Sequence, residues 1–181
     1  MGTPTQELGS IADDFILPGI REGQFRLSDY LNGKRGAVVV FWSGVCSHCV
    51  RYDLYLNNFA EKHPELALIG VASRQGETVE QIAKTAHERG LIFPLLHDLG
   101  AKVAAQWMTQ QTPRAFLLDT NRSLIYRGAI DNFKYAGDPE YVPYLEDAIG
   151  DFLAGKPLRR GETSSFGCAI QSIYYILPRH L

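Results

Sequence analysis

The segment Cys46-Ser47-His48-Cys49 comes soon after the apolar run Gly36-Ala-Val-Val-Val-Phe-Trp42. Continuous apolar and β-branched residues are typical of a strand buried on both faces. We therefore predict that Cys46 lies where a strand passes into a helix, and that this helix runs from Cys46 to about His63, before Pro64. A thiol at a helix N-terminus is favoured as the thiolate, because it faces the positive end of the helix dipole. Two cysteines separated by two residues can close a disulfide or hold a metal ion.

Strand and helix patterns alternate around this motif. The first half has the order β-α-β-α, which implies a parallel sheet with right-handed crossovers. The second half adds a helix, a hairpin and a last helix. In chain order we predict extended segments over 12–18 and 24–27, strands over 37–42 and 66–72, helices over 46–63, about 79–90 and 98–108, a hairpin of 114–119 with 123–128, and a helix over about 141–152.

Length and composition indicate one globular domain. The chain has 181 residues, of which 45% are apolar and 21% charged, so it is long and apolar enough to bury a sizeable core. The net charge of -2 gives no case for a nucleic-acid partner, and three cysteines are too few for a disulfide scaffold. No apolar stretch approaches the roughly 20 residues that span a membrane, and the N-terminus lacks a signal-peptide pattern. We expect a cytoplasmic monomer, or an exported protein whose signal peptide has been removed.

The order of elements around the CxxC resembles the thioredoxin fold. The residues that carry this resemblance are Val38 to Trp42, Cys46 to Cys49, Thr112-Pro113 and Phe116-Leu-Leu-Asp119. The opening segments, Asp14 to Pro18 and Leu27 to Leu31, are similar to the redoxin branch, which contains the TlpA-like oxidoreductases and the AhpC/TSA peroxiredoxins. Three later segments resemble a peroxiredoxin-like group of that branch: Tyr126 to Asp131, Leu153 to Pro157, and Gly167 to Ile170.

The resemblance implies an α/β fold, a thioredoxin-like three-layer α/β/α sandwich with a central mixed sheet and an N-terminal β extension. We assign residues 1–157 to this redoxin domain. Residues 158–181 form a tail that carries Cys168 and is not a separate domain.

The resemblance also implies a thiol–disulfide oxidoreductase with antioxidant activity, acting on protein or small-molecule thiols and disulfides. Cys46 would be the attacking thiolate, and Cys49 would resolve the mixed disulfide. We expect no dissociable cofactor, because the Cys46–Cys49 pair itself carries two electrons. A protonated His48 would stabilise the Cys46 thiolate and make the disulfide a stronger oxidant. The alternative for His48 is a solvated surface residue.

Three residues are assigned to substrate binding. Thr112-Pro113 matches the cis-proline loop that faces the CxxC in the thioredoxin fold, which implies a cis bond and a Thr112 backbone that pairs with a bound peptide. Trp42 is the third residue, with core packing as its alternative. Cys168 is an auxiliary candidate, as a second resolving cysteine, a metal ligand or an inert thiol.

The chain departs from two related patterns. Val40 stands where thioredoxin has a buried aspartate that helps to move protons, so the proton acceptor for Cys49 is unassigned. A peroxiredoxin-like peroxidase is the first alternative function: Ser43 and Arg114 match residues of its motif, but Val39 replaces its proline. The second alternative is a copper- or zinc-binding protein. We predict no metal site, because the CxxC supplies two ligands and zinc usually has four.

Overall fold

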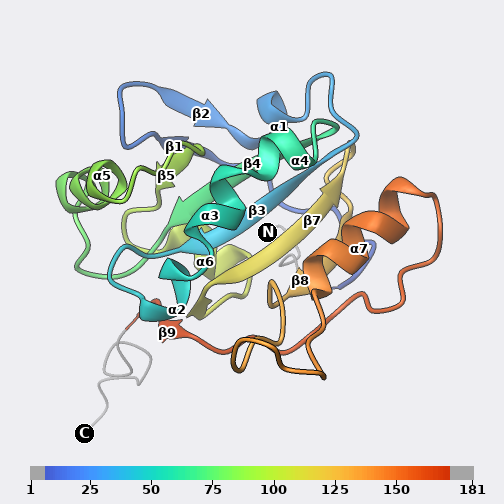
Figure 1. Ribbon diagram of the computed structural model, residues 1–181. Helices are drawn as coiled ribbons and strands as arrows, with labels where there is room; N and C mark the ends of the chain where they lie inside the picture. The colour runs from blue at the N-terminus through green and yellow to red at the C-terminus, as the bar shows by residue number, and fades with distance from the viewer. Residues whose placement is uncertain (1–6, 172–181) are drawn as a thin grey trace, which may run out of the picture.

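The computed structural model describes residues 7–171; residues 1–6 and 172–181, at the ends of the predicted domain and tail, lie outside the described part. Its centre is a five-stranded sheet in the order β5-β4-β3-β7-β8 (Figure 1). β3 pairs in parallel with β4, and β4 with β5, whereas β7 runs antiparallel to both β3 and β8. The predicted mixed sheet is therefore confirmed. Its strands are β3 (Gly36–Trp42), β4 (Leu66–Ala72), β5 (Leu95–His97), β7 (Arg114–Asp119) and β8 (Leu124–Gly128).

Both faces of this sheet are covered, which gives the predicted α/β/α layers. Successive side chains of a strand point to opposite faces, so Val38, Val40 and Trp42 enter one core while Val39 and Phe41 enter the other. The first core is covered by α2 (Ser47–Val50), α3 (Asp53–Asn57), α4 (Phe59–Lys62), α5 (Val79–Glu88) and α7 (Tyr144–Leu153). The second is covered by α1 (Leu27–Tyr30), α6 (Lys102–Gln106) and the N-terminal segment. The predicted N-terminal extension is the antiparallel pair β1 (Ile16–Pro18) and β2 (Gln24–Arg26).

Two predicted helices were wrong in extent. The helix expected over 46–63 is divided into α2, α3 and α4, because Tyr52 and Asn58 have ψ angles of 1° and -1°. The Tyr52 hydroxyl donates to Asp131 Oδ1 at 2.5 Å, a tertiary contact that helical periodicity cannot report. The helix expected over 98–108 begins only at Lys102. Ala101 before it is left-handed (φ 55°), and the Asp98 carboxylate accepts from the backbone N–H groups of Val103 and Ala104.

The tail folds back onto the domain. Its residues 158–171 follow α7, pass along β8 through backbone bonds between Arg127 and both Gly161 and Thr163, and end in β9 (Cys168–Ala169). β9 pairs antiparallel with β6 (Gln111–Thr112). Neither short strand was predicted, because two residues carry no detectable period. Figure 1 shows β9 beside α2 at one end of the molecule.

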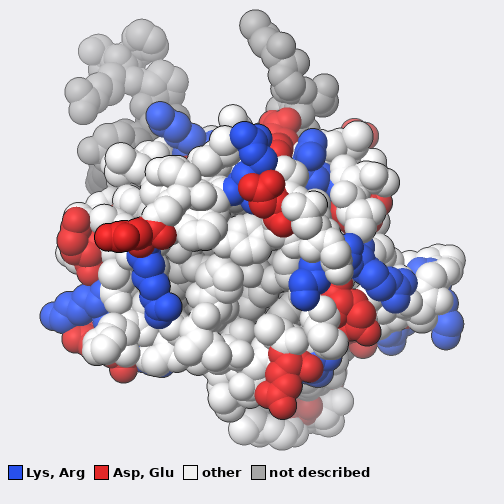
Figure 2. Space-filling model, turned by 90° about the horizontal axis from the view of Figure 1, so that it is seen from above, with Lys and Arg blue, Asp and Glu red and all other residues white. Residues whose placement is uncertain are grey.

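The face of the molecule seen in Figure 2 carries charges of both signs. Figure 2 shows acidic and basic side chains interspersed on the face seen from above, in line with the net charge of -2. Among the helices of residues 7–171, none is long and apolar enough to cross a bilayer.

Candidate active site

Cys46 lies at the junction that the sequence predicts. β3 ends at Trp42, the chain turns through residues 43–45, and Cys46 is the N-cap of α2. The turn is closed by the Cys46 N–H, which donates to Ser43 O at 3.3 Å. α2 has only four residues. Its dipole is correspondingly small, so the ionisation of Cys46 depends on direct hydrogen bonds more than the predicted long helix would imply.

Hydrogen bonds to sulfur set the ionisation of Cys46. They lower the pKa of its thiol to about 4, first through the Cys49 thiol and then through Cys168 and Thr112, against an opposing effect of burial. In its protonated form Cys46 Sγ also donates to Thr112 O at 3.3 Å. The Thr112-Pro113 bond is cis, as predicted. The lowered pKa favours the Cys46 thiolate at neutral pH, and its sulfur lies beside the cis-proline loop.

Cys49 has the opposite character. Burial, followed by the hydrogen bond and the charge of Cys46, raises the pKa of the Cys49 thiol far above its usual value. Cys49 thus stays protonated and donates to the Cys46 thiolate. Two thiols with separated pKa values suit an attacking and a resolving cysteine. Val40, at the position of the thioredoxin aspartate, is fully buried in β3.

Two charged residues that sequence reasoning missed hold the turn before Cys46. The buried Glu77 carboxylate accepts from Gly44 N at 2.7 Å and from Ser43 Oγ at 3.0 Å. Arg89 donates to Gly44 O at 3.1 Å, and its Nε bonds Asp53 Oδ2 at 2.7 Å. Both peptide groups of Gly44 are therefore fixed from the α5 side. No spacing in the sequence links Glu77 or Arg89 to the CxxC.

Of the remaining predicted site residues, His48 and Pro113 line a surface cavity, whereas Trp42 lies in the hydrophobic core. The His48 side chain is exposed and lines a cavity of about 650 Å³, together with Pro113, Arg51, Tyr144, Phe133 and Phe166. Trp42 is fully buried with the Arg89 guanidinium 5.2 Å from its ring centre, so it packs in the core, which was the alternative to its predicted substrate contact. Arg114 donates to Ser165 Oγ at 3.3 Å and lies near the Phe116 ring.

Cys168 is brought to the site by the tail. It is the residue of β9 that pairs with Thr112 in the β6–β9 ladder. Its thiol hydrogen-bonds Cys46, and it is half-buried. The structure therefore joins all three cysteines, Cys46, Cys49 and Cys168, at the end of β6.

Comparison with known proteins places the chain among redoxins. A sequence model described as the AhpC/TSA family matches residues 8–127. The thiol-disulfide oxidoreductase ResA of Geobacillus kaustophilus (strain HTA426) is 32% identical over 114 residues, which cover 63% of this chain and 64% of the relative. The ResA of Geobacillus thermodenitrificans (strain NG80-2) matches to the same extent. The chain thus spans slightly less than two thirds of the length of these curated relatives.

Solved structures share the fold over most of the chain. A hypothetical protein from Sinorhizobium meliloti 1021 superposes with a TM-score of 0.81 and 28% identity, covering 91% of this chain and 94% of that one. A putative thiol:disulfide interchange protein DsbE from Chlorobium tepidum has a TM-score of 0.61 and 22% identity over 67% of this chain and 84% of its own. At that identity the second likeness shows the thioredoxin fold alone.

Proposed function

This chain belongs to the AhpC/TSA family, and from that premise we propose that it is a thiol–disulfide oxidoreductase working through Cys46 and Cys49. One observation carries the proposal. Cys46 Sγ lies 3.3 Å from the carbonyl oxygen of Thr112 in the cis-proline loop, with the Cys49 thiol hydrogen-bonded to it, and these neighbours lower the pKa of Cys46 to about 4 while the pKa of Cys49 is raised. A stabilised thiolate is the nucleophile of disulfide exchange, and a neighbouring thiol completes the transfer.

The reaction proceeds in two displacements. The Cys46 thiolate attacks one sulfur of a substrate disulfide, a Cys46–substrate bond forms, and the other substrate sulfur leaves as a thiolate. Cys49 then loses its proton and attacks Cys46 Sγ, which releases the second substrate thiolate. The Cys46–Cys49 disulfide forms, and two electrons pass to the substrate. The same steps in reverse oxidise a substrate dithiol. The two electrons pass directly between the cysteine pair and the substrate sulfurs, so the proposed reaction uses no dissociable cofactor.

The low pKa of Cys46 favours the oxidising direction. A stabilised thiolate stabilises the reduced enzyme, and this raises the reduction potential of the disulfide. We propose protein or small-molecule dithiols as substrates, which would bind in the cavity beside His48 and Pro113. His48 lies at the rim of this cavity, and in its protonated form it would add to the stabilisation of the Cys46 thiolate.

Insulin reduction in the presence of dithiothreitol tests the proposed activity. The wild-type protein should accelerate insulin precipitation, and Cys46→Ser should abolish the acceleration. The double variant Cys49→Ser, Cys168→Ala is the matched control, because it keeps the Cys46 nucleophile but has no second thiol to resolve the intermediate, so it should accumulate a mixed disulfide on Cys46. Full activity in the Cys46→Ser variant would refute the proposal.

Neither alternative function gains support from the site. The Ser43 hydroxyl, which matches the peroxidase motif, donates to Glu77, and the Arg114 guanidinium donates to Ser165. Within residues 7–171 no group of three or more His, Cys, Asp or Glu side chains is arranged to hold a metal ion. Hydrogen peroxide consumption with a thiol donor is the assay that distinguishes a peroxidase.

A further inference from the structure

The nucleophile of the proposed reaction is sealed from solvent. Cys46, Cys49 and Thr112 each have 0% of their surface exposed, and Pro113 is also buried. A substrate disulfide must reach Cys46 Sγ in line with its own sulfur–sulfur bond, which requires an open path to that sulfur. The structure therefore shows a state of the enzyme in which an external substrate has no access to Cys46.

The tail supplies part of this cover. β9 lies along β6, with Cys168 opposite Thr112 and Ala169 opposite Gln111. The Thr112 hydroxyl also lies 3.5 Å from Cys168 O. The edge of Thr112 that was predicted to pair with a substrate peptide thus already carries an antiparallel strand of the same chain.

The close approach of β9 depends on Gly167. A β-carbon at this position would lie 1.7 Å from Thr112 O and 2.6 Å from its carbonyl carbon. No side chain fits there, because the obstacle is backbone that cannot turn aside. Gly167 thus lets the tail settle onto the cis-proline loop with the next residue, Cys168, at the active sulfur.

Cys168 meets Cys46 as a substrate thiol would. Its thiol hydrogen-bonds Cys46 Sγ, and the His48 backbone also contacts Cys168. Burial, followed by the bond to Cys46, raises the pKa of the Cys168 thiol, so it is the protonated partner of the Cys46 thiolate. Cys46 is therefore flanked by a resolving thiol on its own helix and by a second thiol on the tail.

We infer that β9 is an internal substrate: Cys168 exchanges with the Cys46–Cys49 disulfide to form a Cys46–Cys168 disulfide, and external substrates reach Cys46 only after β9 leaves β6. The inference rests on the proposed role of Cys46 as nucleophile. In the exchange Cys168 loses its proton and its thiolate attacks Cys46 Sγ. The Cys46–Cys49 bond breaks, and Cys49 leaves as a thiolate that takes up a proton. One disulfide replaces another, so no external oxidant or reductant is consumed.

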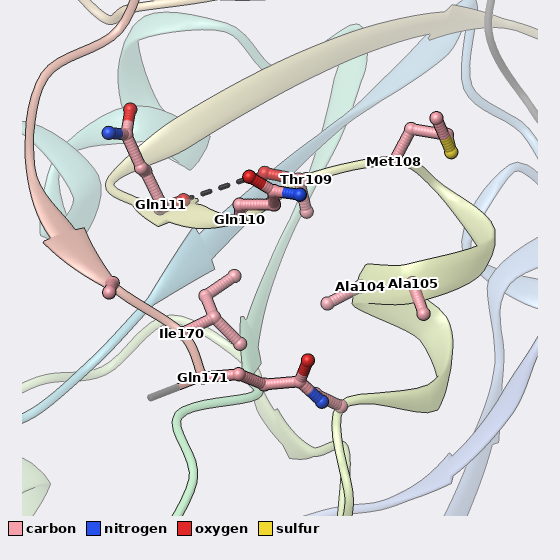
Figure 3. Close-up of a pocket in the computed structure, with 10 residues that line it drawn as sticks. Ala104, Ala105, Met108, Thr109, Gln110, Gln111, Ile170 and Gln171 are labelled. Carbon is pink, nitrogen blue, oxygen red and sulfur yellow. Dashed lines mark hydrogen bonds between the residues drawn. The ribbon is translucent and has the colours of Figure 1, made fainter. Parts of the chain in front are cut away.

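β9 itself is attached to the rest of the chain by few contacts. The next residue, Ile170, is 2% exposed and packs in the second core, and its backbone is held by Ile170 N–H to Gln110 O at 2.9 Å and by Gln75 N–H to Ile170 O at 2.8 Å. Arg74 donates to Ala169 O at 3.1 Å. Beside the strand lies a cavity of about 460 Å³, toward which Ile170 points from the tail and which Ala104, Ala105 and Met108 line from the opposite side (Figure 3). β9 can therefore leave β6 without disturbing any strand of the central sheet.

Disulfide mapping tests the exchange directly. The Cys49→Ser variant of the full chain is oxidised with one equivalent of glutathione disulfide, its free thiols are alkylated, and its peptides are identified by mass spectrometry. We expect an intramolecular Cys46–Cys168 disulfide as the main product and release of both glutathione molecules. A stable Cys46–glutathione adduct with Cys168 alkylated would overturn the inference. In the double variant with Cys168→Ala, that adduct is the expected product.

A glycine substitution tests the cover without touching a sulfur. Gly167→Ala keeps all three cysteines and forces β9 away from Thr112, so iodoacetamide should alkylate Cys46 about tenfold faster or more. Tenfold corresponds to about 1.4 kcal/mol, which is the size of one or two backbone hydrogen bonds. Gly150→Ala is the matched control, since a β-carbon there meets no atom within 4 Å. An unchanged rate in Gly167→Ala would overturn the inference.

The two proposals fail in different ways. If Cys46→Ser still reduces insulin, the proposed function itself is wrong. If insulin reduction needs Cys46 but Cys168 forms no disulfide with it and Gly167→Ala leaves the alkylation rate unchanged, only the internal substrate is wrong.

Discussion

Removing the Glu77 carboxylate should destabilise the turn that presents Cys46. Glu77 is only 7% exposed, and it accepts two hydrogen bonds from this turn, at 2.7 Å from Gly44 N and at 3.0 Å from Ser43 Oγ. A hydrogen bond to a charged group contributes about 1.5–3 kcal/mol. The variant Glu77→Ala loses both bonds and leaves two donors in a mostly buried place. The lower end of the range applies, because Arg89 still holds Gly44 O, so we expect a loss of about 3 kcal/mol.

Glu77→Gln should cost much less. Its amide oxygen can still accept from the Gly44 N–H, so only the bond to the Ser43 hydroxyl and the charge are lost, and we expect a loss of about 1 kcal/mol. The measurement is urea unfolding of the reduced protein, followed by circular dichroism. Glu65→Ala is the matched control: within residues 7–171 this exposed glutamate makes no side-chain hydrogen bond or ion pair, so its replacement should change the unfolding free energy by no more than about 0.5 kcal/mol.

Insulin reduction separates a positioning role from a purely structural one. Under conditions in which all three variants are folded, Glu77→Ala should lose activity, Glu77→Gln should recover most of it, and Glu65→Ala should match the wild type. A Glu77→Ala protein that unfolds within about 0.5 kcal/mol of the wild type would refute the reasoning, because the turn would then be held by other contacts.

Three further predictions concern the thiols. In the reduced protein, far-ultraviolet thiolate absorbance should titrate with a pKa of about 4; Cys46→Ser should remove this step and Cys49→Ala should raise its pKa, whereas a wild-type midpoint near about 8.5 would contradict the geometry. Because the folded pKa of Cys46 lies below the unfolded value of about 8.5, the unfolding free energy of the reduced protein should rise between about pH 4 and that value. The extra unfolding free energy of the wild type over the Cys46→Ser variant should be lost as the pH falls through about 4. Parallel pH profiles of the unfolding free energy for the two proteins would exclude this linkage. Equilibration with glutathione should give the Cys46–Cys49 disulfide a reduction potential nearer to about -120 mV than to about -270 mV. A value near about -270 mV would mean that the protein is a reductase.

Local patterns accounted for most of the fold. Continuous apolar runs predicted β3 and β4, and two strand-like runs on either side of the Thr120-Asn121 turn predicted the β7–β8 hairpin, because both signals lie in consecutive residues. The cis bond before Pro113 followed from resemblance, since the residue pair alone would favour trans. The long helix predicted after Cys46 was wrong because the backbone departs from helical geometry at Tyr52 and Asn58. The Tyr52 hydroxyl is hydrogen-bonded to Asp131, and such a tertiary contact leaves no mark on the local pattern.

The sequence by itself determined the CxxC, its place after a buried strand and the general chemistry of two thiols. Only the tertiary structure decided what surrounds them. Cys46 and Thr112 are 66 residues apart in the chain, and Thr112 and Cys168 are 56 apart. The Cys49 thiol of the motif itself makes the largest contribution to the low pKa of Cys46, and hydrogen bonds from Cys168 and Thr112 across these separations lower it further. The same fold buries Cys46 and brings a third thiol against it. The physical reason is that pKa and access depend on neighbours in space, whereas a sequence pattern records neighbours along the chain.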